Sequence, residues 1–129
     1  MRQTLAAPAD EFDPTPPGLL AGDPPAQLVP LLEEMAADVR PESMGTALRV
    51  MAEADQRDLL PHIAVPTLVI WGELDVRSPL SVARQFERAI PSAKLVVIPG
   101  AGHVSNLERP EPSNHVVREF CRVHSPLST

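Results

Sequence analysis

Two short apolar runs dominate the second half of the chain, and a helical pattern separates them. The runs are Thr-Leu-Val-Ile at 67–70 and Lys-Leu-Val-Val-Ile at 94–98. Continuous apolar runs of this length are typical of fully buried parallel strands. Between them the apolar residues recur at the spacing of one helix face: Val82, Ala83, Phe86, Ala89 and Ile90. The order strand, helix, strand predicts a parallel α/β unit.

Prolines indicate where these elements begin and end. Pro66 precedes the first run, at a position where proline loses no ladder hydrogen bond. Ser78–Pro79 is a typical helix start, with serine as N-cap and proline at the first helical position, and Pro91 ends this helix. Pro110 begins a last helix, whose apolar side is expected to consist of Val116, Val117, Phe120 and Cys121.

The first half of the chain carries two further helical patterns behind a proline-rich leader. Residues 1–24 show no sustained period, which predicts an irregular or disordered segment. A helix is expected from near Val29, with Pro30 in its first turn and an apolar stripe of Leu28, Leu31, Leu32, Met35 and Val39. A second stripe runs to about Asp55 and consists of Met44, Ala47, Leu48 and Met51. A short packed turn is expected at Leu59, Leu60 and Ile63.

These patterns divide the chain into four parts. They are a leader at 1–24, a helical region at 25–60, an α/β region at 61–124 and a frayed tail at 125–129. A chain of 129 residues has room for one domain and one modest core.

Charge and composition exclude several classes of partner. The net charge of −6 and an aromatic share of 3% without tyrosine argue against a nucleic-acid partner. The single cysteine, Cys121, leaves no intramolecular disulfide and fits a reducing compartment. We find neither a signal peptide nor an apolar run long enough to cross a bilayer, so we expect a cytoplasmic protein with no membrane partner.

The candidate chemistry lies in the loops that follow the two apolar runs. Trp71–Asp75 follows the first run and Pro99–His103 follows the second. Neighbouring parallel strands lie about 4.8 Å apart, so their loops can bring Asp75 and His103 within hydrogen-bond distance. The glycines at 100 and 102 allow a steep turn and a close backbone approach. A carboxylate that orients an imidazole is part of a nucleophilic active site. The alternatives are a turn-capping aspartate and an ordinary surface histidine.

These loops carry a family resemblance. Residues 65–75 with Ser78–Pro79 resemble the penultimate strand and acid loop of the α/β-hydrolase family, and residues 90–103 with 107–111 resemble its last strand, histidine loop and closing helix. Residues 40–41 and 52–59 resemble the end of its cap region. The resemblance implies a partial α/β-hydrolase fold, an α/β architecture with the last two parallel strands, flanking helices and cap-like helices before them. It also implies that Asp75 is the acid and His103 the general base of a catalytic triad.

The family's nucleophile motif is missing. Its serine stands in a strand-turn-helix elbow of the form G-x-S-x-G. The nearest segment here is Pro41–Gly45, in which proline replaces the first glycine, and Ser43 fits an N-cap or a first helical turn better. Three further serines near the loops have easy capping roles: Ser78, Ser81 and Ser105. With no nucleophile identified, the resemblance predicts a truncated or half-enzyme chain that is inactive alone.

Several interpretations stay open. The chain is either the C-terminal part of a hydrolase for small ester or amide substrates, or a non-catalytic module that pairs with another chain through open sheet edges. An active enzyme that uses Ser43 is a third hypothesis, and the family also includes cofactor-free peroxidase-like, dehalogenating and acyl-transferring members. Val76 and Val104 are candidates for lining a substrate pocket, with simple packing as the alternative. The pair Cys121 and His124 lacks supporting ligands, so we expect no metal site, and we expect no cofactor.

Overall fold

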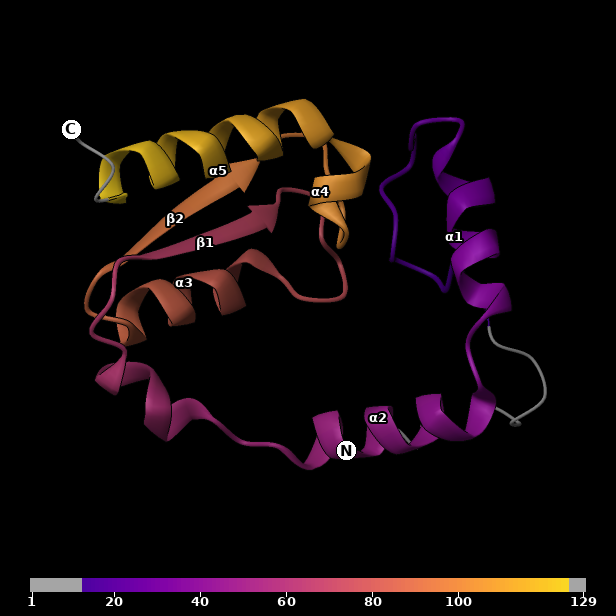
Figure 1. Ribbon diagram of the computed structural model, residues 1–129, viewed down its shortest axis with the longest axis horizontal. Helices are drawn as coiled ribbons and strands as arrows, with labels where there is room; N and C mark the ends of the chain where they lie inside the picture. The colour runs from indigo at the N-terminus through magenta and orange to yellow at the C-terminus, as the bar shows by residue number, and fades with distance from the viewer. Residues whose placement is uncertain (1–12, 126–129) are drawn as a thin grey trace.

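The two predicted strands pair side by side in a computed structural model that describes residues 13–125. The strands are parallel, and their register runs from Thr67 opposite Ala93 to Gly72 opposite Ile98 (Figure 1). The elements follow one another as α1 (Leu28–Ala37), α2 (Pro41–Glu53), the 3-10 helix η1 (Arg57–His62), β1 (Thr67–Gly72), α3 (Leu80–Ala89), β2 (Ala93–Ile98), α4 (Ser105–Glu108) and α5 (Pro110–His124). The predicted α/β class, with two parallel strands, flanking helices and two helices before them, is confirmed.

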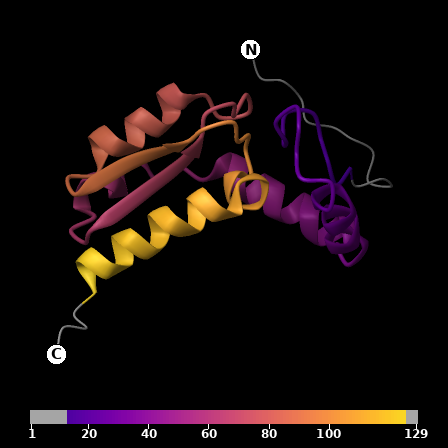
Figure 2. The same ribbon diagram turned by 90° about the horizontal axis from the view of Figure 1, so that it is seen from above.

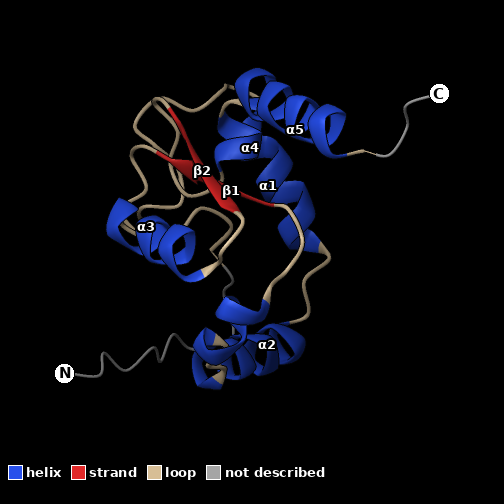
Figure 3. Cartoon of the chain, turned by 90° about the vertical axis from the view of Figure 1, so that its left-hand side faces the viewer, coloured by secondary structure: helices blue, strands red, loops and turns tan. Residues whose placement is uncertain are grey.

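The sheet is the middle of three layers. Helix α3 covers one face of the two strands and α5 covers the other (Figures 1 and 3). Both strands end at the same edge, because Gly72 and Ile98 are register partners. The loops that leave this edge therefore begin next to each other.

The strands are less buried than their apolar sequences predicted. Residues 67–71 of β1 are half-buried, and full burial is reached only at the strand ends, at Gly72 and Ile98. The expectation of fully buried strands is wrong because two strands with one helix on each face leave both outer edges uncovered. The buried apolar core of the described residues is correspondingly small: Leu28, Ala83, Ile90, Ile98 and Ala101.

Two details of the predicted helices need correction. Helix α3 begins at Leu80 with Pro79 at the N-cap position, and no side chain caps it, so Ser78 is not its N-cap. In α5, Cys121 is exposed and Val117 is 43% exposed. The side of α5 that faces inward carries the predicted Val116 and Phe120, together with Ser113. A sheet of two strands contacts only this narrow stripe of the helix, and positions 117 and 121 turn away from it.

Helices α1 and α2 form where the apolar stripes predicted them. Pro30 lies in the first turn of α1, and Pro41 is the first residue of α2. Both helices lie apart from the sheet and its two covering helices (Figures 1 and 2). Much of the apolar stripe of α2 is consequently exposed, with Leu48 at 56% and Met51 at 72%.

The chain on either side of these elements has no regular structure where it is described. Residues 13–24 form no helix or strand, yet their backbone hydrogen-bonds to the loop that carries His103. The other predicted leader residues, 1–12, and the tail residues 126–129 lie outside the described part of the chain. None of the described helices has both the length and the apolar character needed to cross a membrane.

Candidate active site

The carboxylate of Asp75 is held rigidly in the turn after β1. Its Oδ1 accepts hydrogen bonds from the backbone N–H groups of Arg77 at 3.0 Å and Ser78 at 2.9 Å. The Asp75 side chain is only 4% exposed. Two backbone donors therefore fix the orientation of the carboxylate and leave Oδ2 for another partner.

That partner is His103. The distance between His103 Nδ1 and Asp75 Oδ2 is 2.9 Å. A carboxylate only accepts hydrogen bonds, so Nδ1 is the protonated nitrogen and Nε2 of the neutral ring carries the free lone pair. The imidazole is 38% exposed, in contrast to the buried acid. The arrangement presents a basic nitrogen on a ring that the acid holds in place.

Glycines allow the two loops to come this close. A Cβ atom at Gly72 would lie 2.0 Å from the carbonyl oxygen of Gly102 and 2.5 Å from that of Ala101. Gly100 has φ +65°, in the left-handed region that favours glycine. The backbone N–H of Leu74 donates to Ala101 O at 2.8 Å and joins the loops directly. The steep turn and the close approach predicted from the glycines of the histidine loop are confirmed.

A small cavity of about 110 Å³ lies beside the pair, at the carboxyl end of β1. It is lined by Ile70, Trp71, Gly72, Asp75, His103 and Ser105. Val76 and Val104 do not line it. Val76 is 74% exposed and lies near Gly18, and Val104 is half-buried before α4. The role of these two valines in a substrate pocket stays a prediction.

The candidate nucleophiles are placed differently from one another. Ser43 is exposed in the first turn of α2, which is one of the two positions that the sequence predicted for it. Ser81 is exposed on α3. Ser78 supports Asp75 through its backbone N–H. Ser105 is buried in the cavity wall as the first residue of α4 and is not a cap. Within residues 13–125, no serine hydroxyl forms a hydrogen bond to His103.

Metal-binding groups do not gather in the described part of the chain. No cluster of three or more histidine, cysteine, aspartate or glutamate side chains occurs among residues 13–125 that could hold a metal ion. Cys121 is exposed, and the ring of its proposed companion His124 packs on Phe120 at a centroid distance of 4.5 Å.

One residue that contacts the histidine loop, Glu108, was not among the candidates from the sequence. Glu108 is 1% exposed, and its carboxylate accepts hydrogen bonds from the backbone N–H groups of Gly102 at 2.9 Å and Ala21 at 2.7 Å. A glutamate directly before Arg109–Pro110 has the pattern of a solvated charge at a helix start, and glutamate is rarely fully buried. The available signal was its position only five residues after a candidate catalytic histidine.

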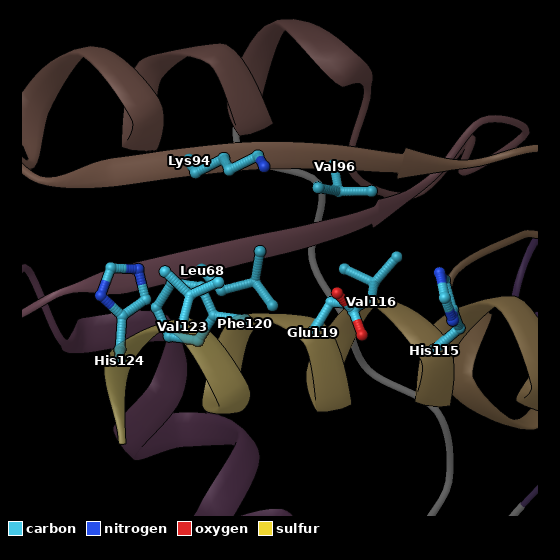
Figure 4. A pocket seen from close by; sticks show the side chains of 9 residues that line it. All are labelled: Leu68, Lys94, Val96, His115, Val116, Glu119, Phe120, Val123 and His124. Carbon is cyan, nitrogen blue, oxygen red and sulfur yellow. The ribbon is translucent and has the colours of Figure 1, made fainter. Parts of the chain in front are cut away.

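A second cavity, of about 280 Å³, lies between α5 and the strands (Figure 4). Leu68 and Val96 face it from the sheet, and Val116 and Phe120 face it from α5. It shares no residue with the cavity at Asp75 and His103. The gap shows that α5 is not fully packed against a sheet of two strands.

Comparisons with known proteins give matches over most of this chain. The family model described as alpha/beta hydrolase fold matches residues 24–110. The pimeloyl-acyl-carrier-protein methyl ester esterase of Vibrio vulnificus is 34% identical over 80 residues, which cover 62% of this chain and 31% of that protein. The dihydrolipoyllysine-residue acetyltransferase component of the acetoin cleaving system of Pseudomonas putida is 34% identical over 114 residues, which cover 81% of this chain and 29% of that protein.

A solved structure matches at the level of both sequence and fold. A thermophilic esterase from Thermogutta terrifontis has a TM-score of 0.70 and 38% identity, and the match covers 77% of this chain and 37% of that one. The chain therefore spans about a third of the length of the relatives it matches.

Proposed function

Because this chain belongs to the family of the alpha/beta hydrolase fold, we propose that Asp75 and His103 are the acid and the base of an ester-hydrolysing site. The observation that carries the proposal is the 2.9 Å contact between His103 Nδ1 and Asp75 Oδ2, which leaves Nε2 as the free base. Two of the relatives named above are esterases. We further propose that the nucleophile comes from a segment outside these residues, because no G-x-S-x-G motif occurs among them.

The proposed chemistry begins with a proton transfer to His103. Nε2 takes the proton of the nucleophile's hydroxyl while the hydroxyl oxygen attacks the ester carbonyl carbon. Asp75 stabilises the imidazolium that forms and keeps the ring in one orientation. Nε2 then gives the proton to the leaving alkoxide, and the acyl group stays on the nucleophile. In the second half-reaction Nε2 takes a proton from a water molecule, and the water oxygen attacks the acyl carbonyl carbon. The bond between the acyl group and the nucleophile oxygen then breaks, Nε2 returns the proton to that oxygen, and the acid leaves.

The first test uses the chain by itself. We expect no hydrolysis of short activated esters above the rate of the His103→Ala variant, because the pair alone supplies neither nucleophile nor oxyanion site. Burst kinetics in the wild-type chain that vanish in His103→Ala would show that it holds its own nucleophile. Labelling of Ser43 by a fluorophosphonate would then identify that residue.

The second test joins the chain to a complete esterase. In a chimaera, this chain replaces the matched 37% of the Thermogutta terrifontis esterase. We expect ester hydrolysis whose kcat falls roughly 10⁶-fold in His103→Ala and roughly 10⁴-fold in Asp75→Asn. His115→Ala is the matched control, because His115 is an exposed histidine on α5 that does not contact the pair. A chimaera that hydrolyses esters equally well with and without His103 would refute the assignment.

An interaction module is the second candidate function. It is supported by the two-stranded sheet, whose outer edges are unpaired in the described residues. A module of this kind folds stably by itself or with a partner chain and has no esterase activity in the chimaera. Co-purification with a polypeptide that carries a nucleophile elbow would instead favour the hydrolase.

A further inference from the structure

We propose that Glu108 is a positioning residue for His103. The inference rests on the proposed function, because it assigns Glu108 a role in orienting the base of that site. The carboxylate of Glu108 joins the histidine loop to the segment Leu19–Ala21, which lies almost ninety residues earlier in the sequence. We call this set of hydrogen bonds the Glu108 clamp.

The clamp fixes the backbone on both sides of the Gly102 Cα atom. Glu108 Oε1 accepts from Gly102 N at 2.9 Å, and Oε2 accepts from Ala21 N at 2.7 Å. The backbone N–H of His103 in turn donates to Leu19 O at 3.1 Å. Two consecutive amide groups, those of Gly102 and His103, are thus held by partners from outside the loop. The direction of the His103 side chain follows from the orientation of this backbone.

The chemistry of the site requires a carboxylate rather than an amide. Both partners of the Glu108 oxygens are N–H donors, so both positions need acceptors. A glutamine would place its NH₂ group against one of the two donors. The fit is also sterically tight, because a Cβ atom at Gly102 would lie 2.8 Å from Glu108 Oε1 and 2.7 Å from Ala21 N.

Burying the Glu108 carboxylate costs solvation energy, so we infer that its role is to place the histidine loop and not to stabilise the fold. Glu108 is 1% exposed, and in the described part of the chain no cationic side chain pairs with its carboxylate. A buried charge that is compensated only by backbone donors loses much of its solvation energy, and an apolar side chain of similar volume is often a cheaper way to fill such a place. The carboxylate provides two hydrogen-bond acceptors in fixed positions, and these set where the histidine loop lies.

The test observes His103 directly and does not depend on esterase activity. We would record nitrogen-15 and proton spectra of the imidazole in the 129-residue chain at about 10 °C, near the usual temperature of maximum stability. The wild type should show a single tautomer with a downfield Nδ1 proton bonded to Asp75. The Glu108→Gln variant should lose the downfield Nδ1 proton and populate both tautomers. Glu111→Gln, which makes the same charge change at an exposed position nearby, should leave both unchanged.

The outcomes separate a positioning role from a structural one. If Glu108→Gln melts at a lower temperature but keeps the Nδ1 proton and the single tautomer, Glu108 is structural only and the inference is wrong. If the variant does not fold, the wild type decides the question through scalar couplings across the hydrogen bonds from Gly102 N and Ala21 N to the Glu108 carboxylate. On warming, the Nδ1 proton should disappear together with these couplings, and an Nδ1 proton that outlasts them overturns the inference.

Failure of the proposed function gives a different result. In that case His103→Ala leaves the chimaera's esterase activity unchanged, while the effect of Glu108→Gln on the His103 spectrum is still observed. The converse pattern, an inactive His103→Ala chimaera and an unchanged spectrum in Glu108→Gln, would reject only the positioning role.

Discussion

The distance between the acid and the base depends on residues that have no functional group. Gly72 ends β1 directly against the backbone of the histidine loop, where a side chain would meet the carbonyl oxygen of Gly102 at 2.0 Å. A backbone carbonyl that is itself held by its neighbours has little freedom to move aside. The separation of Asp75 and His103 is therefore set partly by the absence of a Cβ atom three residues before the acid.

Gly72→Ala should separate the two loops. We expect a loss of about 1–3 kcal/mol in the free energy of unfolding, because the added methyl group overlaps backbone atoms instead of a flexible side chain. Gly45→Ala is the matched control, since Gly45 lies inside α2 and nothing outside the neighbouring helix backbone lies within 4 Å of the added Cβ. This variant should gain roughly 0.5–1 kcal/mol. Urea unfolding of both variants measures the difference. Equal stabilities would mean that the loops adapt to the methyl group.

Asp55 should titrate well below an ordinary aspartate. The hydrogen bonds from Arg57 lower the pKa of Asp55 from 3.8 to about 2. Because the folded-state value is the lower one, any stabilisation from this pair is present above about pH 4 and is lost as the pH falls through 2. Carbon-13 NMR of the carboxyl group measures the titration, and Arg57→Gln should return it to near 3.8. An unchanged titration in that variant would exclude Arg57 as the cause.

At the scale of elements, the helices in the first half of the chain have apolar stripes that are largely exposed. Helices α2 and α3 both carry an apolar stripe, but Met51 of α2 is 72% exposed whereas Ala83 of α3 is fully buried. The difference lies in what surrounds each helix, because α3 has a sheet to cover and α2 does not (Figure 3). Periodicity therefore predicts which side of a helix is apolar, and burial depends on a partner surface.

Two apolar truncations should test this difference. Ile98→Ala removes a side chain that is 1% exposed at the end of β2, and it should cost about 2–5 kcal/mol through lost burial and a residual cavity. Met51→Ala removes a mostly exposed side chain and should change stability by less than about 0.5 kcal/mol. Thermal and urea unfolding of the two variants measure the contrast. A large loss for Met51→Ala would show that α2 packs on a surface in solution.

The strands and helices could be predicted because their signals are local. The parallel pair, the turn glycines and the position of Pro110 at the start of α5 all follow from short patterns in the sequence. The contact of Glu108 with the segment Leu19–Ala21 could not be found in this way, since it joins residues 87 positions apart. The predicted inward side of α5 is wrong in part, because it too depends on structure that lies far away in the sequence. An apolar pattern marks Val117 and Cys121, but the width of the sheet decides which residues it covers.

At the scale of the whole molecule, large apolar side chains remain exposed on several elements. Exposed apolar side chains lie on α1 and α2, and both outer edges of the sheet are open among the described residues. The groove along α5 in Figure 4 adds a further uncovered face. Surfaces of this kind are typical of parts that pack against additional structure. The relatives, of which the chain spans about a third, have two thirds of their length left to supply such structure.

The isolated chain should therefore be only marginally stable. A core of this size rarely supplies more than about 3–5 kcal/mol, and a two-stranded parallel sheet leaves its edge N–H and C=O groups open to other chains. We expect either a broad thermal transition or oligomers whose population rises with protein concentration, measured by calorimetry and light scattering. The esterase chimaera serves as the comparison, because there the same residues have a longer sheet to join, and it should unfold in one sharp transition. A sharp, concentration-independent transition of the lone chain in a monodisperse monomer would contradict the prediction, and would favour a module that folds on its own over a part of a larger enzyme.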